Sequence, residues 1–158
     1  PAPSPDLEMQ VLHEDTLVVI AGKKRQPLTN TALLKNVVQL ADLAKLPLIA
    51  PSGPNAFRLL IDTEMQRLNC KPNIVLEIDG LNAILELTKE GLGYAVLPAY
   101  TLSNFASPQD FTTHRIEKPK LRSQLMLVWS ARRPMTATHK AAMQLTHDVV
   151  SQALQANS

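Results

Sequence analysis

The chain has 158 residues, of which 45% are hydrophobic, and its 16 lysine and arginine residues against 14 acidic residues give a formal net charge of +2. This length and composition are typical of a globular protein with enough chain to bury an apolar core. The charge is too small to indicate that this chain alone binds nucleic acid. The single cysteine, Cys70, excludes an internal disulfide and fits a reducing compartment.

Other classes of protein are disfavoured by what the sequence lacks. No apolar run approaches the roughly 20 residues of a membrane span. The opening PAPSPDLEMQ has neither the basic block nor the apolar block of a signal peptide. The four histidines are scattered without the spacing of a zinc site. We therefore expect no membrane contact, no metal and no other cofactor.

The first half of the chain alternates strand and helix signals. Residues 7–22 end in an apolar, β-branched run before a glycine and predict a buried strand. Residues 23–36 begin with a basic turn and continue as a stretch whose structure the sequence leaves open. A short helix that stops before Pro47 is followed by a predicted strand at 48–50. Apolar residues at helical spacing then predict a helix over 55–69.

The second half continues the same alternation. We predict a strand over 73–79, a helix over 81–90 and a short strand over 94–98. A longer strand is expected at 121–131, and an amphipathic helix at 136–155 closes the chain. Because strands separated by helices of this length usually pair in the same direction, the sequence predicts a mainly parallel α/β architecture.

The GLG at residues 91–93 looks like part of a glycine-rich phosphate loop. Such a loop follows a strand and opens a helix, so that the phosphate meets the positive end of the helix dipole. Here the order is reversed, because Gly91 and Gly93 follow a helix and open a strand. We predict that Gly91 ends the helix in a left-handed conformation and that Gly93 lies where two backbones pack closely.

Several segments together resemble one protein family. The order strand, Asp79, helix, GLG and a strand ending in Leu-Pro is similar to the second half of the effector-binding domain of LysR-type transcriptional regulators. Residues 11–22, VLHEDTLVVIAG, resemble the family's strand that crosses from lobe I to lobe II. Residues 37–53, VVQLADLAKLPLIAPSG, resemble its linker, short helix and first lobe II strand. Residues 125–150 resemble its returning strand and terminal helix.

This resemblance implies an α/β, two-lobed, periplasmic-binding-protein-like (type 2) fold. Lobe II, residues 23–120, would be complete and lobe I would be partial. Residues 1–22 would contain the end of lobe I and the crossing strand, and residues 121–158 its returning strand and terminal helix. The family's winged helix-turn-helix, linker helix and first two βα units have no counterpart in this sequence. We therefore expect an N-terminally truncated regulator.

The function implied by the resemblance is effector sensing. A small metabolite would bind between the lobes and control DNA binding by a winged helix-turn-helix outside this chain. The resemblance also implies a homodimer or homotetramer, and we expect a cytoplasmic protein. A solute-binding protein of a transport system shares the fold and remains the alternative. We expect no catalytic residues, because the sequence shows no paired acid and base at a recognisable spacing.

The first candidate for a binding site is PSGPN, residues 51–55, between a strand and a strong helix. We predict Pro54 in the first helical turn and Ser52 as the cap. The exposed amides of Gly53, Asn55 and Ala56, with the helix dipole behind them, would accept a carboxylate or another anion. An ordinary capped helix start explains the same pattern, and the sequence leaves both interpretations open.

The second candidate is IDGL, residues 78–81, with Asp79 predicted as the helix N-cap and Gly80 beside it. Regulators that this chain resembles often have Ser, Thr or Asn at this position. Because a carboxylate repels an anion, we hypothesise an effector that presents a hydroxyl, an amine or another donor to Asp79; simple capping is the alternative. Pro98, at the carboxyl end of its strand, is a weaker candidate. Arg58 could reach a ligand but better fits a solvated helix face.

Overall fold

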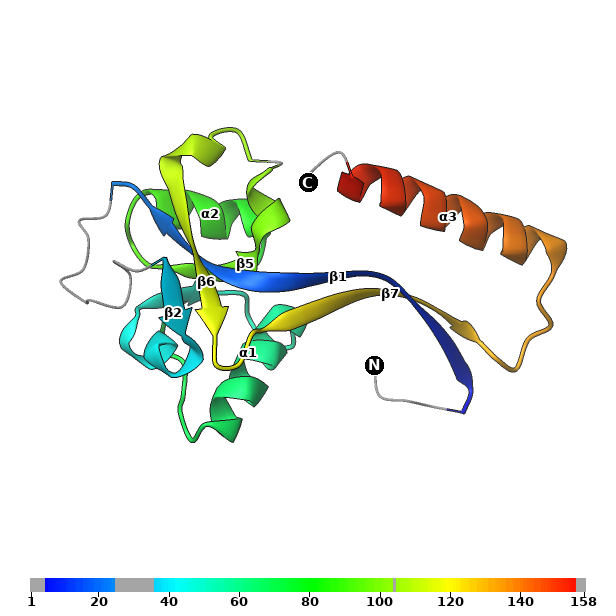
Figure 1. Cartoon of the computed structure of the whole chain (residues 1–158), viewed down its shortest axis with the longest axis horizontal. Helices are drawn as coiled ribbons and strands as arrows, with labels where there is room; N and C mark the ends of the chain where they lie inside the picture. Colours follow the sequence, from blue (N-terminus) through cyan, green and yellow to red (C-terminus); the bar gives the residue numbers. More distant parts are fainter. Residues whose placement is uncertain (1–4, 25–35, 104, 156–158) are drawn as a thin grey trace. The chain divides into compact units, whose positions relative to one another are not determined.

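A computed structural model of the chain describes residues 5–24, 36–103 and 105–155 (Figure 1). Its contacts divide it into unit 1, which comprises Pro1–Asp15 and Gln124–Ser158, and unit 2, which comprises Thr16–Ser123. The strands are β1 (Leu7–Gly22), β2 (Val37–Gln39), β3 (Leu48–Ala50), β4 (Ile74–Glu77), β5 (Ala95–Pro98), β6 (Phe111–Glu117) and β7 (Arg122–Ser130). The helices are α1 (Ala56–Arg67), α2 (Leu81–Lys89) and α3 (Ala137–Gln155), with 3₁₀ turns η2 (Leu40–Lys45), η3 (Ala99–Leu102) and η4 (Pro108–Asp110).

The predicted helices and strands are found with ends within two residues of their expected positions. The short helix before Pro47 is the 3₁₀ turn η2. The sequence left the structure of residues 23–36 open, and residues 25–35 of this stretch lie outside the described residues. Sequence reasoning missed β2 and β6, although the β-branched residues Thr112, Thr113 and Ile116 of β6 are a usable strand signal.

The strands of unit 2 run mainly in one direction, as predicted. β3 pairs with β4 in parallel, and a parallel bridge joins Leu48 of β3 to Tyr94, just before β5. β2 and β6 are also parallel to each other. The exception is β1, which lies between β5 and β6 and is antiparallel to both. The carboxyl ends of β3, β4 and β5 therefore lie at the same edge of the sheet.

Two apolar clusters cover the two faces of this sheet. On one face, Leu17 and Val19 of β1 pack in a cluster with Ile61 and Met65 of α1. On the other, Val18 and Ile20 pack in a cluster that contains Ile84 and Leu85 of α2. Successive residues of a strand point to opposite faces, so β1 supplies both clusters and is apolar throughout this part. Helices α1 and α2 accordingly lie on opposite faces of the sheet (Figure 1).

Three glycines of unit 2 hold backbones in close or left-handed positions. Gly91 follows α2 with a φ of 81°, and Gly93 packs so closely that a Cβ there would lie 2.6 Å from Cγ1 of Ile49, which confirms both predictions. At Gly22 a Cβ would lie 2.3 Å from the carbonyl oxygen of Thr88 and 2.8 Å from Cα of Lys89. The end of β1 can therefore approach the end of α2 only because residue 22 has no side chain.

One buried histidine has incomplete hydrogen bonding. His114 of β6 is 7% exposed, and its Nε2 lies 3.3 Å from Oγ1 of Thr112. Its Nδ1 is buried and has no hydrogen-bond partner among the described residues. Burial lowers the pKa of His114 from its ordinary value of 6.5, because the imidazolium form would lose its hydration.

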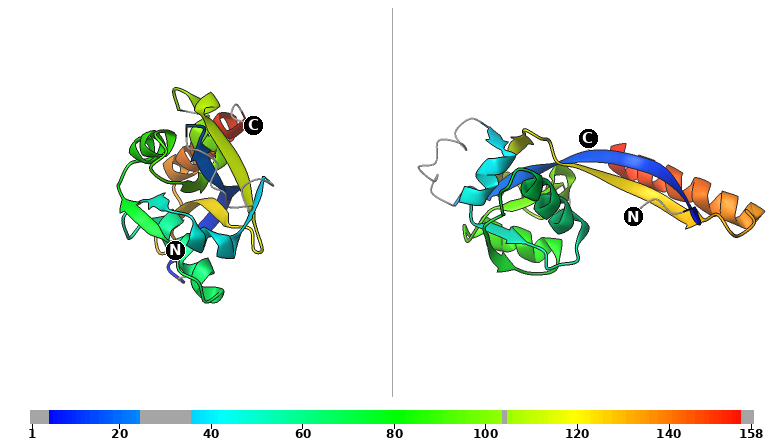
Figure 2. Two further views of the ribbon diagram at one scale, coloured as in Figure 1. Left: turned by 90° about the vertical axis from the view of Figure 1, so that its left-hand side faces the viewer. Right: turned by 90° about the horizontal axis from the view of Figure 1, so that it is seen from below.

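Unit 1 differs from unit 2 in how little of it is buried. It contains the first part of β1, most of β7 and helix α3, and the two strands pair along their length (Figure 2). The indole Nε1 of Trp129 donates to Glu8, and Arg132 forms an ion pair with Asp6. None of the described residues of unit 1 is buried. The large hydrophobic residues that it exposes are Leu7, Met9, Val11, Leu125, Val128, Met135, Leu145 and Val149.

The described residues of unit 1 thus lack a core of their own, whereas unit 2 has two. A two-stranded ribbon and one helix bury too little apolar surface for independent stability.

No helix in the described part of the chain is long and apolar enough to cross a membrane.

The first prediction concerns Gly22. Gly22→Ala should lower the free energy of unfolding by about 1–3 kcal/mol, because the new methyl group meets backbone atoms that cannot rotate away. Gly53→Ala is the matched control, since a Cβ at Gly53 meets no atom within 4 Å. Urea unfolding of the whole chain measures both. Equal effects of the two substitutions would contradict the close packing of β1 on α2.

The second prediction concerns pH. As the pH falls through about 6.5, the unfolded chain takes up a proton that folded His114 resists, so stability should fall. At higher pH the imidazole is neutral in both states and adds no pH dependence. His114→Gln should therefore weaken the pH dependence of urea unfolding between about pH 5 and 7, and His139→Gln, at an exposed position, should not. The same pH dependence in both variants would contradict the shifted pKa.

Candidate functional site

The carboxyl ends of three neighbouring strands carry the predicted site residues. The strand β3 is followed by residues 51–55, β4 by residues 78–80, and β5 ends at Pro98. In the parallel register Ala50 is opposite Glu77, and the amide of Ile78 donates to the carbonyl of Ala50 at 3.1 Å. This edge of the sheet, which we call the strand-end edge, thus holds all of the predicted site residues.

A hydrogen bond joins the first two segments of the strand-end edge. The amide of Ser52 donates to Oδ1 of Asp79 at a distance of 3.2 Å. The Asp79 side chain lies at an exposed position, and Ser52 is half-buried. Residues that are 27 positions apart in the sequence therefore belong to one polar cluster.

The cap of helix α1 differs from the prediction. Asn55 is the N-cap residue, and its Oδ1 accepts from the amides of Phe57 at 2.9 Å and Arg58 at 3.4 Å. The predictions that Ser52 caps this helix and that Pro54 lies in its first turn were wrong, since α1 begins one residue after Asn55. The asparagine satisfies amides that Ser52 is too far along the chain to reach.

The start of helix α2 also differs from the prediction. Its N-cap residue is Gly80, with a φ of 99° and no side-chain cap, so the prediction that Asp79 caps α2 was wrong. The reason is that the Asp79 carboxylate is directed to the amide of Ser52 instead. A φ in this range favours glycine, because a Cβ would strain the backbone.

Pro98 is buried at the end of β5. It lies opposite Leu17 of β1, and its carbonyl accepts from Oγ1 of Thr101 at 2.7 Å. Leu17 is the second residue of unit 2, and its amide donates to the carbonyl of Leu121 at 2.9 Å. Chain segments that continue into unit 1 therefore leave unit 2 next to Pro98.

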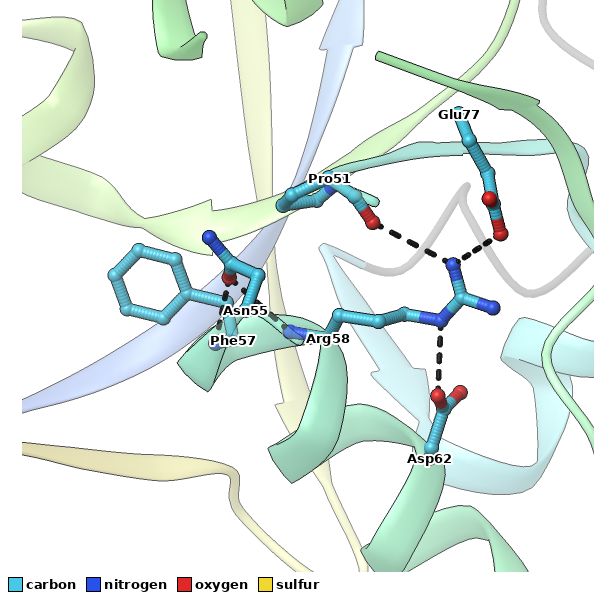
Figure 3. A network of polar contacts seen from close by, with 6 residues as sticks. All are labelled: Pro51, Asn55, Phe57, Arg58, Asp62 and Glu77. Atoms are coloured by element: carbon cyan, nitrogen blue, oxygen red, sulfur yellow. Dashed lines mark hydrogen bonds and ion pairs between the residues drawn. The ribbon is translucent and has the colours of Figure 1, made fainter. Parts of the chain in front are cut away.

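Arg58 binds several groups around the strand-end edge (Figure 3). Its Nε donates to Asp62 at 2.9 Å, and its Nη1 donates to Glu77 at 2.7 Å and reaches the carbonyl of Pro51 at 3.5 Å. The side chain is 18% exposed, so the expected solvated arginine is instead partly buried. We call these residues the Arg58 cluster; it ties α1 to the ends of β3 and β4.

The charge of Arg58 is compensated within this cluster. Hydrogen bonding to Glu77 raises the pKa of Arg58 above its ordinary value, Asp62 adds to the effect, and partial burial opposes it. Two carboxylates and one guanidinium make the cluster anionic as a whole. Sequence reasoning missed the cluster because its members come from a helix, a loop and a separate strand.

A surface pocket of about 570 Å³ lies elsewhere on unit 2. It is formed by the side of α1 and the turn before β4. Arg58 and Asp62 of the Arg58 cluster line it, whereas residues 51–55, residues 78–80 and Pro98 do not. The residues that line it are Arg58, Asp62, Gln66, Asn69, Cys70, Lys71 and Pro72. In the described part of the chain, no group of three His, Cys, Asp or Glu side chains could hold a metal ion.

Comparison with known proteins gives a consistent result. The family model of the LysR substrate binding domain matches residues 1–151. The chain is similar to the regulatory domain of CcmR from Synechocystis PCC6803, solved in complex with 2-PG, with 20% identity and a TM-score of 0.76 over 94% of this chain and 70% of that chain. A search of curated protein sequences found no match.

Two further solved structures have the same fold. The effector-binding domain of QuiR in complex with shikimate is 21% identical with a TM-score of 0.73, over 96% of this chain and 69% of that chain. CbnR, a LysR family transcriptional regulator, is 17% identical with a TM-score of 0.64, over 83% of this chain and 44% of that chain. At these identities the likeness establishes the fold.

The third prediction tests the Arg58 cluster. Arg58→Ala should lower the free energy of unfolding by about 1–2 kcal/mol, because it removes charge-assisted hydrogen bonds of a partly buried side chain. Arg67→Ala is the matched control, since Arg67 is 69% exposed and pairs with Glu64 of its own helix. It should cost less than about 0.5 kcal/mol. Equal losses in urea unfolding would show that Arg58 is an ordinary surface arginine.

Proposed function

The chain belongs to the LysR substrate-binding domain family, and from this premise we propose that it binds its effector at the strand-end edge of unit 2. It is an effector-sensing domain of a LysR-type regulator, with the periplasmic-binding-protein-like fold that the sequence indicated. The alternative of a transport solute-binding protein is set aside by the family. The residues that we assign to the effector are Ser52, Gly53, Pro54, Asn55, Asp79, Gly80 and Pro98.

One observation carries the assignment of the site. The segments that follow β3 and β4 are joined by the bond from the Ser52 amide to Asp79, and the end of β5 lies at the same edge. Ligands of open α/β sheets bind outside the carboxyl ends of the strands, where loops and helix starts present polar groups. The amides of Gly53, Asn55 and Ala56 have no hydrogen-bond partner among the described residues and are available there.

The route from effector to response starts at the same edge. Leu17 pairs with Pro98 and bonds to Leu121, so the segments that continue into unit 1 leave unit 2 beside the proposed site. An effector that binds more tightly to one arrangement of these segments shifts the equilibrium toward that arrangement. A DNA-binding domain of the same regulator would respond to the shift.

Our assignment of the lobes follows from the two units. Unit 2 corresponds to lobe II together with the end of the crossing strand β1, and unit 1 corresponds to part of lobe I. The sequence suggested lobe boundaries at residues 22 and 120, whereas the two units divide after residues 15 and 123. The absence of buried residues in the described part of unit 1 supports a partial lobe I that further polypeptide completes. We also propose a homodimer or homotetramer in the cytoplasm, as the family resemblance implies.

The effector itself would be a small organic molecule. The structures of CcmR and QuiR that resemble this chain hold 2-PG and shikimate, respectively. Binding without catalysis is the role that we assign, because the family that the chain matches is a substrate-binding domain.

The fourth prediction tests the location of the site. A thermal-shift screen of small metabolites against the whole chain should yield a stabilising ligand, since a ligand that binds only the folded state raises its stability. Asp79→Ala should weaken that ligand at least tenfold, or about 1.4 kcal/mol. Asp42→Ala, in η2, should leave its affinity unchanged. A ligand that binds the Asp79→Ala and Asp42→Ala variants with equal affinity, and that contacts residues 66–72 instead, would place the site in the pocket beside α1.

A further inference from the structure

The loop of residues 51–55 has few bonds of its own near β3. Its far end is fixed, because Asn55 caps α1. Nearer the strand, the amide of Ser52 donates to the exposed carboxylate of Asp79, which water also reaches. The amide of Gly53 has no hydrogen-bond partner among the described residues. Such a loop loses conformational entropy when it binds a ligand, unless another part of the molecule already holds it in place.

Arg58 supplies bonds to both sides of this loop. Its Nη1 donates to Glu77, the last residue of β4, at 2.7 Å and reaches the carbonyl of Pro51, the first residue after β3, at 3.5 Å (Figure 3). Its Nε donates to Asp62 of α1 at 2.9 Å, which holds the guanidinium against the helix. The Arg58 side chain is mostly buried, so water competes less for these bonds than it would at an exposed arginine.

Arg58 itself lies outside the group of residues that we assign to the effector. It lines the pocket beside α1, whereas residues 51–55 and 78–80 do not. A ligand at the strand-end edge therefore meets the two loops, and Arg58 can affect that ligand through the backbone positions of Pro51 and Glu77.

We propose that Arg58 is a positioning residue for effector binding: by bridging Pro51 and Glu77 it fixes the two loops of the strand-end edge and raises the affinity for a ligand that it does not touch. This inference rests on the proposed function and adds a residue that determines affinity at the same site. Arginine suits this role because its planar guanidinium donates in several fixed directions, which a lysine ammonium group does not.

Amide hydrogen exchange of the whole chain, followed by NMR, tests whether Arg58 fixes the loops. The amides of Ser52 and Ile78 report on the two loops, since each donates across them. The amide of buried Tyr94 reports on unfolding of unit 2 as a whole. In Arg58→Ala we expect exchange at the two loop amides to become at least tenfold faster relative to that of Tyr94. Arg67→Ala should leave this ratio unchanged.

Titration with D-glycerate tests the effect on affinity. The carboxylate of this probe fits the free amides of residues 51–55, and its hydroxyl groups can donate to Asp79. We expect glycerate to shift the amide resonances of residues 51–55 and 78–80 in the unaltered chain. Arg58→Ala should bind it at least fivefold more weakly, because the loops must then be ordered on binding. Arg67→Ala should bind it as the unaltered chain does.

Two further variants separate bridging from charge. Arg58→Lys keeps the positive charge but loses the fork of donors, so it should bind glycerate as weakly as Arg58→Ala does. Glu77→Ala breaks the same bridge from its other end, at a side chain that is 50% exposed and therefore tolerant of substitution. Removal of a carboxylate would by charge alone strengthen binding of the glycerate anion, whereas the positioning role predicts binding at least threefold weaker.

Each contrary outcome has a distinct meaning. Unchanged glycerate affinity in Arg58→Ala, full affinity in Arg58→Lys or tighter binding by Glu77→Ala would overturn the positioning role and leave the proposed site intact. Exchange that accelerates equally at Ser52, Ile78 and Tyr94 would likewise overturn it. Glycerate shifts confined to residues 66–72, or no shifts in the unaltered chain, would overturn the proposed site and with it the role of Arg58 in binding.

Discussion

The central constraint on the structure is that β1 passes through the middle of the sheet of unit 2 against the direction of its neighbours. Its residues Leu17–Ile20 pair with β5 and its residues Val18–Gly22 pair with β6, and side chains from Leu17 to Ala21 pack alternately on the two faces. This explains why the segment is continuously apolar and why it must end in a glycine beside α2. The position of β1 also sets the position of β5, whose last residue, Pro98, lies opposite Leu17 at the strand-end edge.

The strand-end edge and the Arg58 cluster depend on each other. Parallel pairing brings the ends of β3 and β4 together, and Arg58 then binds Pro51 after one strand and Glu77 at the end of the other. The bond between Ser52 and Asp79 joins the same two loops a few residues farther on. The loops that form the proposed site are thus held from two points, which limits the entropy lost when a ligand orders them.

Much of the fold follows from the sequence, whereas details of the site do not. Hydrophobic spacing and glycine positions are local, so the helices, β1, Gly91 and Gly93 were predicted correctly. The two helix caps were predicted wrongly because the choice between Ser52 and Asn55, or between Asp79 and Gly80, depends on a bond between residues far apart in the sequence. The partners of Arg58 were missed for the same reason, since Glu77 comes from another element.

The most direct test of this account is a crystal structure of the chain with its effector bound. The account predicts that polar atoms of the effector lie within hydrogen-bond distance of Asp79 and of backbone amides in residues 51–55. It also predicts that the backbone conformation of β1 and β7, where they leave unit 2, differs from that of the chain without effector. An effector bound in the pocket beside α1, with residues 51–55 and 78–80 free of contact, would contradict it. In that case the strand-end edge would be a structural feature of the fold, and the sensing site would have to be sought among residues 58–72.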